Sequence, residues 1–147
     1  MTDGWVAYLR KHIPQVRTMD LQAGPTSEEG VRLRVPLNLN HNDKGTGFGG
    51  SLATLCTLAG WCVVSEICAR NDCTVDIVVV TSRAEYIKPV TDEYLSALGL
   101  WPDTAEEAEF LRTLQKDKWA KMRVRSRTGN AESPAVVFEA TFGAKVL

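Results

Sequence analysis

The sequence predicts an α+β fold in which an antiparallel β-sheet wraps around one long central α-helix. Two observations support this prediction. The predicted strands are grouped along the chain and do not alternate with helices, which argues against a doubly wound parallel sheet. The stretch from Gly49 to about Arg70 is apolar nearly all round. It is too long for a strand, and a helix of this kind is enclosed by other elements.

The chain before this helix is predicted to hold one short helix and two strands. Trp5, Leu9 and Ile13 recur at every fourth position, which predicts an amphipathic helix that ends by Pro14. We assign Arg17–Gly24 as a weak strand. Val31–Leu37 alternates apolar and polar residues, which is the pattern of a half-buried strand.

The chain after the long helix is predicted to be mostly strand. Ile77–Val80 is a continuous β-branched run, which is expected where both faces of a strand are covered. A capping pattern near Asp103 marks the start of one more helix. The predicted elements are strands over Val75–Ile87 and Tyr94–Trp101, a helix from about Asp103 to about Gln115, and strands over Trp119–Thr128 and Pro134–Val146.

Composition excludes several classes of protein. The 147 residues are 44% hydrophobic and 24% charged, which predicts a single domain over residues 1–147. Lys and Arg number 17 against 18 Asp and Glu. There is no basic excess for nucleic acid or for an anionic membrane. The long apolar segment is interrupted by polar residues such as Thr54, Thr57 and Glu66, so we expect a core helix and no membrane span.

The four cysteines are Cys56, Cys62, Cys68 and Cys73. Their spacing contains no C-x-x-C pair and no nearby histidine, so we expect no metal site. Three of them fall in the apolar helix, where a free cysteine behaves as a small hydrophobe. The N-terminus does not resemble a secretory signal, and we expect a reducing, cytoplasmic location.

Four of the 11 glycines lie between Gly45 and Gly50, directly before the long helix. The first turn of a helix has unpaired N–H groups and a partial positive charge, which together suit a developing oxyanion. A carbonyl group lying over the Gly49 and Gly50 amides would be polarised without any side chain. A plain glycine-rich turn into a helix explains the same residues, and no phosphate-binding loop motif is present.

The segment Asn40–Leu52, with Tyr86-Ile87-Lys88-Pro89-Val90 further on, resembles the YiiD C-terminal family of hotdog-fold thioesterases. The resemblance spans nearly the whole chain. It implies the hotdog fold, an antiparallel sheet around a central helix. It also implies a homodimer or a dimer of dimers with sites at the subunit boundary, an acyl-CoA or acyl-ACP substrate, and no cofactor.

A second, more distant resemblance suggests roles for individual residues. The run Asn42-x-x-Gly45-x-x-Phe48-Gly49-Gly50 is similar to the motif of phenylacetyl-CoA-type thioesterases, but Phe48 stands at its histidine. Thr57 stands where that group has its catalytic aspartate. A threonine orients a water molecule but is not a base near neutral pH.

The resemblance therefore leaves the base open. Asp43 is the nearest carboxylate in sequence and is our candidate base or nucleophile, although it is equally a candidate cap for the loop or helix. Asn42 occupies the place of an aspartate in another hotdog group. We expect Asn42 and Thr57 to position water or the carbonyl, and the Gly49 and Gly50 amides to stabilise the oxyanion. His41 adjoins the loop and is more readily explained as facing solvent.

Substrate contacts are predicted on two surfaces. Phe48 and Tyr86, with Trp61, are candidates for lining an acyl tunnel, and each is equally expected in a core. Lys88 is a candidate phosphate contact. Arg123 and Arg125 belong to a basic row with Lys121 and Arg127. This row either binds the phosphates of coenzyme A or an acidic carrier protein, or is a solvated sheet face, which we favour.

The sequence is compatible with two hypotheses of function. The first is an acyl-CoA or acyl-ACP thioesterase. The second is a non-catalytic acyl-thioester-binding module or a dimeric partner subunit of an acetyltransferase, which the missing helix aspartate and motif histidine motivate. A hotdog dehydratase is disfavoured because its histidine-proline signature is absent.

Overall fold

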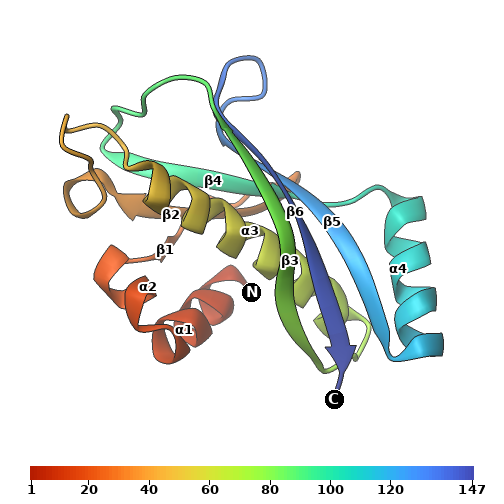
Figure 1. Cartoon of the computed structure of the whole chain (residues 1–147). Coiled ribbons are helices and arrows are strands. Elements are labelled where there is room, and N and C mark those ends of the chain that lie inside the picture. Colours follow the sequence, from red (N-terminus) through yellow and green to blue (C-terminus); the bar gives the residue numbers. More distant parts are fainter.

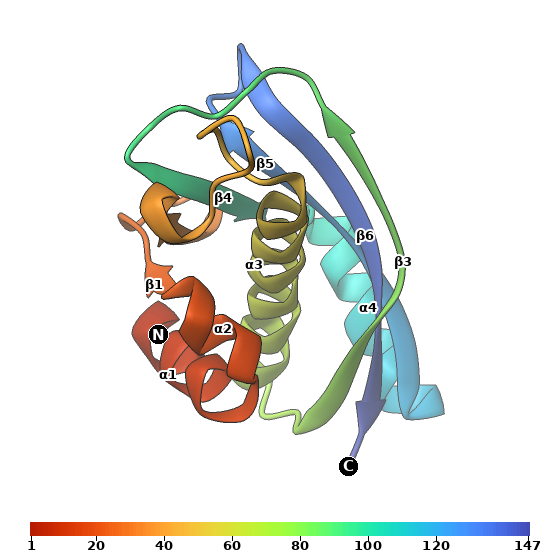
Figure 2. The ribbon, with the colours of Figure 1, turned by 60° about the vertical axis from the view of Figure 1, so that its left-hand side comes forward.

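Helix α3 (Gly49–Arg70) is the axis of the fold, and one six-stranded antiparallel sheet curves around it (Figures 1 and 2). The computed structural model describes residues 1–147. The predicted fold class is confirmed. The other elements are α1 (Thr2–His12), α2 (Pro14–Met19), β1 (Gln22–Ala23), β2 (Gly30–Pro36), η1 (Leu37–Leu39), β3 (Val75–Tyr86), β4 (Tyr94–Leu100), α4 (Thr104–Asp117), β5 (Trp119–Gly129) and β6 (Pro134–Val146).

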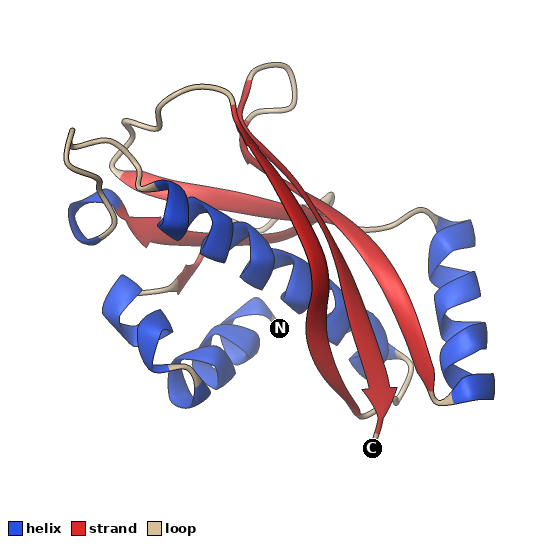
Figure 3. Ribbon diagram, viewed as in Figure 1, coloured by secondary structure: helices blue, strands red, loops and turns tan.

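The strand order is β1-β2-β4-β5-β6-β3, so β3 is an edge strand although it lies mid-chain. β6 pairs along its length with both β5 and β3. In contrast, β4 and β5 are paired at only two positions, Leu98↔Arg127 and Gly99↔Ser126. The two halves of the sheet therefore separate on either side of this contact. Helix α4 packs beside β5, away from the other helices (Figure 3).

The core lies between α3 and the inner face of the sheet. Leu55, Cys62 and Val63 of α3 are fully buried, and Phe142 of β6 and Leu33 of β2 close over them. Helix α3 is long and apolar enough to cross a membrane, but 67% of its most apolar window is buried within the fold. Its apolar surface is thus explained by the core, where each buried aliphatic side chain contributes about 1.5–3 kcal/mol.

The predicted strand over Arg17–Gly24 is wrong for most of its length. Ile13 is extended, and Pro14 then begins the short helix α2, a position that proline favours because its missing N–H is not needed there. Val16 and Met19 are both buried, three residues apart on one helical face. Only Gln22–Ala23 is strand.

The expectation that both faces of the Ile77–Val80 run are covered is also wrong. Val78, Val79 and Val80 are 53%, 48% and 44% exposed. Strand β3 pairs with β6 alone, and its other edge has no partner in the chain. A long apolar strand with a free edge is rare in monomers, since it invites pairing with another chain.

The alternation in β5 is confirmed. Ala120, Met122, Val124 and Ser126 are buried, while Lys121, Arg123 and Arg125 project from the outer face of the sheet. The helix start near Asp103 is confirmed as well. The Asp103 carboxylate accepts a hydrogen bond from the Glu106 N–H at 2.7 Å, which caps α4.

Candidate active site

The first turn of α3 presents three backbone N–H groups without an acceptor. The first hydrogen bond of the helix runs from Leu52 N–H to Phe48 C=O at 2.9 Å, and no side chain caps this end. The amides of Gly49, Gly50 and Ser51 precede this bond. They carry the partial positive charge of a 22-residue helix and are free to bind an oxyanion.

Two aromatic rings flank this turn. The Phe48 ring lies so close to Gly50 that a Cβ atom there would be 2.5 Å from ring atom Cε2. The Tyr86 ring lies beside Gly49, and its hydroxyl donates a hydrogen bond to Gly49 C=O at 3.2 Å. Both rings are about half exposed. The structure therefore brings together Phe48, Gly49, Gly50 and Tyr86, with Tyr86 arriving at the end of edge strand β3.

The loop before α3 is organised by Asn42. Its side-chain oxygen accepts hydrogen bonds from the N–H groups of Lys44 and Thr46 at 2.9 and 3.1 Å. Its amide nitrogen donates to Thr46 Oγ1 at 2.8 Å and to Gly47 C=O at 3.4 Å. Asn42 thus uses both ends of its carboxamide to hold the loop that leads into the first turn.

Asp43 lies at the exposed tip of this loop. Its side chain is 82% exposed and pairs with Lys44 Nζ at 3.1 Å. It makes no hydrogen bond to the first turn of α3, so it does not cap this helix. His41 is exposed too, with Nδ1 at 2.8 Å from Asn42 C=O. Within one chain, neither group contacts the glycine amides.

Thr57 lies two turns further along α3, on the strip that the sheet leaves uncovered. Its hydroxyl donates to Ala53 C=O at 2.8 Å, and the hydroxyl of Thr54 donates to Gly50 C=O at 2.9 Å. Thr57 borders a mainly apolar groove of about 460 Å³ between α1, α3 and β3. Trp61 and Tyr8, stacked at 5.7 Å between ring centroids, line the same groove.

The predicted phosphate contacts lie elsewhere. The Nε atoms of Arg123 and Arg125 are 3.9 and 3.4 Å from the Glu139 carboxylate, on the outer face of the sheet. Within one chain the sheet separates them from the start of α3. Lys88 Nζ donates to Ser133 Oγ at 2.6 Å, beside the β5–β6 hairpin.

No cysteine is suited to act as a nucleophile near this site. Burial raises the pKa of the Cys56 thiol to about 12, and the hydrogen bond with Thr128 offsets only part of this effect. Burial also raises the pKa of Cys62 and Cys68. No group of three or more His, Cys, Asp or Glu side chains is placed to hold a metal ion.

One protein family matches nearly the whole chain. The model of the family described as "Putative thioesterase (yiiD_Cterm)" matches residues 5–146. The chain belongs to the YiiD C-terminal family. The resemblance on which the sequence analysis relied is thereby confirmed.

Solved structures share the hotdog fold of this YiiD C-terminal-family chain. A "putative thioesterase" from Shewanella oneidensis is 24% identical, with a TM-score of 0.86 over 99% of this chain and 97% of that one. A protein of unknown function from Chlorobaculum tepidum is also 24% identical, with a TM-score of 0.91 over 98% and 93%. A "Probable Thioesterase" from Pseudomonas aeruginosa is 16% identical, with a TM-score of 0.74 over 98% and 95%.

Two sets of hydrogen bonds that hold elements of this YiiD C-terminal-family fold in place were not predicted from sequence. The buried amide of Asn40 donates to Met19 C=O at 3.0 Å and to Pro36 C=O at 2.9 Å, which anchors the start of the loop. Trp5 Nε1 donates to Glu66 Oε2 at 2.9 Å and so fastens α1 against α3. Asn40 belongs to the motif that carries the family resemblance, and no local sequence pattern indicates its two acceptors.

Proposed function

We propose that this protein hydrolyses an acyl thioester, carried by coenzyme A or by an acyl carrier protein, at the start of α3. The observation that carries the proposal is the set of three unpaired amides at Gly49, Gly50 and Ser51. Gly50 is exposed and Gly49 is half-buried, and no side chain caps this turn in competition with a ligand. Membership of the thioesterase family supports the same chemistry.

In the proposed reaction, the thioester carbonyl oxygen lies over these amides. Water adds to the carbonyl carbon, the oxyanion that forms is bound by the N–H groups, and the C–S bond then breaks. The thiolate leaves and takes up the proton that the water has lost. Donors of this kind contribute about 10²–10³ in rate each when they are preorganised.

The base in this scheme is Asp43, and Asn42 and Thr57 position water or the carbonyl. Asp43 is on the loop that Asn42 orders, so a modest movement of its tip changes the distance from the carboxylate to the substrate. Its exposure and its pairing with Lys44 make it available but not preorganised in the single chain. Assembly with a second subunit is the step that would order it.

We infer that the protein is a homodimer paired through β3. This strand is 12 residues long, has one free edge and carries three exposed valines. Phe48, Tyr86 and Ile87, each more than half exposed, extend the same apolar surface toward the start of α3. A second copy meets this edge with identical residues, which satisfies both chains at once. The site would then lie at the subunit boundary.

Light scattering after size-exclusion chromatography tests the dimer. Val79→Lys places a charge on the free edge of β3, and we expect this variant to be monomeric where the wild type is dimeric. Val137→Lys is the matched control, because Val137 is similarly exposed but lies on β6, which has a partner on each side. A monomeric wild type would refute the inference.

On the substrate side, Arg123, Arg125 and Lys88 are our proposed contacts for coenzyme A phosphates or for an acidic carrier protein. The groove beside Thr57 and Trp61 is proposed to take the acyl chain, since its lining is mostly apolar. We expect Arg123→Ala with Arg125→Ala to raise KM for acyl-ACP and leave kcat unchanged.

The decisive experiment measures free thiol and free carboxylic acid released from a panel of acyl-CoA and acyl-ACP thioesters. Asp43→Ala is expected to lower turnover at least about a hundredfold, as loss of a proton-transfer group does. Asn42→Asp keeps the two acceptor contacts of the loop and tests the amide donor alone. Asp3→Ala, an exposed carboxylate on α1, is the matched control. Unchanged rates across the panel for Asp43→Ala would remove its assigned role.

The second candidate is a non-catalytic acyl-thioester-binding module, including a dimeric partner subunit of an acetyltransferase. The observation that favours it is that no carboxylate or imidazole of the same chain hydrogen-bonds to the three N–H groups. It predicts saturable acyl-CoA binding by calorimetry with no thiol released over hours. Measurable turnover by the wild type would eliminate it.

A further inference from the structure

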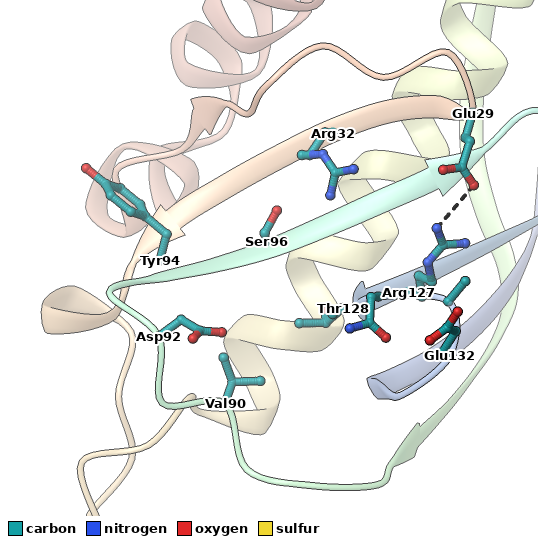
Figure 4. Close-up of a pocket in the computed structure, with 12 residues that line it drawn as sticks. Glu29, Arg32, Val90, Asp92, Tyr94, Ser96, Arg127, Thr128 and Glu132 are labelled. Atoms are coloured by element: carbon teal, nitrogen blue, oxygen red, sulfur yellow. Dashed lines mark hydrogen bonds and ion pairs between the residues drawn. The ribbon is translucent and has the colours of Figure 1, made fainter.

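A polar cleft of about 640 Å³ lies on the outer face of the sheet, opposite the side that holds α3 (Figure 4). It exists because β4 and β5 are paired only at Leu98↔Arg127 and Gly99↔Ser126. Toward Tyr94 and Asn130 the two strands separate, and the β5–β6 hairpin closes the open end. No residue assigned to the thioester site lines this cleft.

Charges of both signs line the cleft, and three of the five charged side chains make no ion pair. Arg127 pairs with Glu29 at 3.2 Å, and this is the one ion pair among the lining residues. The Arg127 side chain is 16% exposed, and its Nε is buried without an acceptor. Arg32 from β2 makes no ion pair. Asp92, before β4, and Glu132, in the hairpin, make none either.

The unpaired positive and negative side chains of the cleft come from different elements and lie apart from one another. Arg32 projects from β2 above β4, Asp92 lies at the far end of the cleft beside the start of β4, and Glu132 lies in the hairpin near Arg127 (Figure 4). A simple anion bound by Arg32 would meet three carboxylates in the same cleft. A simple cation near Asp92 or Glu132 would meet two guanidinium groups. A molecule that carries both charges satisfies both sides.

We propose that this cleft binds a small zwitterion, an amino acid or short peptide with a carboxylate and an ammonium group. The carboxylate lies against the Arg32 guanidinium, and the ammonium lies toward Asp92. The half-buried Ser96 of β4 lines the space between them. The volume falls within the usual range for small-molecule sites. The proposal does not rest on the proposed thioester chemistry.

Isothermal calorimetry on the full chain tests the proposal with glutamate, lysine and glycylglycine as zwitterions. Acetate and ethylammonium are the singly charged comparisons. We expect saturable binding of at least one zwitterion below about 10 mM and at least tenfold weaker binding of both single ions. Arg32→Gln and Asp92→Asn are each expected to weaken the zwitterion at least tenfold, because each removes one charged partner.

Two variants are matched controls. Arg83→Gln removes an exposed arginine from β3 at the far edge of the sheet, and Asp3→Asn removes an exposed carboxylate from α1. Both are expected to bind as the wild type does, and thermal melts establish that all four variants are folded. Asp43→Ala is expected to bind the zwitterion normally even where thioester turnover is lost, which separates the two sites.

Three results would overturn the proposal. The first is no saturable heat with any zwitterion at about 10 mM. The second is binding that Arg32→Gln and Asp92→Asn leave unchanged, which would place the ligand elsewhere. The third is equal binding of acetate or ethylammonium, which would show that only one of the two charges matters.

Discussion

Replacing Gly99 by alanine tests how closely the sheet holds the central helix. Gly99 is in β4, and a Cβ atom at this position would lie 2.7 Å from Ala59 O and 2.8 Å from Ala59 C. Ordinary contact begins at 3.4 Å. Both Ala59 atoms belong to the main chain of α3 and cannot rotate away, so the helix must retreat by about 0.7 Å for the methyl group to fit.

Overpacking of a core costs about 1–3 kcal/mol, and the upper value applies here because backbone must move. For a domain of this size, about 3 kcal/mol lowers the melting temperature by about 10 °C. Differential scanning calorimetry of Gly99→Ala measures this directly. A urea denaturation series gives the same quantity at room temperature, and its slope reports whether the unfolded state is altered.

Gly4→Ala is the matched control. Gly4 is in α1, and a Cβ atom there meets nothing within 4 Å. Alanine gains up to about 1 kcal/mol over glycine within a helix, so this variant should melt at or above the wild-type temperature. A Gly99→Ala protein that melts within about 2 °C of the wild type would refute the close contact between β4 and α3.

Three further predictions concern the cap of α4, the contact between α1 and α3, and the thiols. The hydrogen bond from Glu106 N–H lowers the pKa of Asp103. Because the pKa of Asp103 is lower in the folded chain than in the unfolded chain, ionised Asp103 stabilises the fold at pH values above the unfolded pKa. This stabilisation is lost as the pH falls through the folded pKa. Asp103→Ala should therefore melt several degrees below the wild type at neutral pH, and the difference should vanish in strong acid. Trp5→Phe deletes the donor to Glu66 and part of the ring that packs edge-on against Trp61, and it should cost at least about 1 kcal/mol in urea denaturation. An aromatic disulfide reagent should modify only the partly exposed Cys73 in the native protein and all four thiols in urea, and rapid native labelling of a second thiol would contradict the buried positions of the other three.

Features with local periodicity could be predicted from the sequence. The length and apolarity of α3 and the alternation in β5 follow from which side chains face the core, and burial repeats with the period of the element. Helix α2 could not be predicted in this way, because it has six residues and only two of them, Val16 and Met19, are buried. Its formation depends on contacts with the rest of the fold.

The position of β3 at the sheet edge required the structure. A β-branched run shows that Ile77–Val80 favours a strand, but the number of neighbours depends on the order in which strands assemble. Strands β4, β5 and β6 follow β3 in the chain, yet only β6 pairs with it. The free edge, and with it the dimer we propose, is therefore a property of topology.

The candidate site also combines contacts that are local in sequence with contacts that depend on topology. Phe48, Gly49 and Gly50 are consecutive, so their proximity was certain once α3 began there. Tyr86 lies 37 residues beyond Gly49, and the hydrogen bond between them depends on where β3 ends. The polar cleft could not be predicted, because Arg32, Asp92 and Glu132 come from separate parts of the chain and meet only where β4 and β5 separate.

The glycines of this chain serve two separable purposes. At Gly99, and at Gly30 beside the Gly99 carbonyl, the atoms that exclude a Cβ belong to backbone, so these positions fix the distance between strands and helix. At Gly49 and Gly50 the nearest atoms belong to the side-chain rings of Tyr86 and Phe48, and both rings are about half exposed. A methyl group at Gly50 therefore costs little stability, but it lies beside the amides that we propose bind the oxyanion. We expect Gly50→Ala to lose turnover at an unchanged melting temperature and Gly99→Ala to lose stability. This contrast would assign Gly50 to the chemistry and Gly99 to the fold.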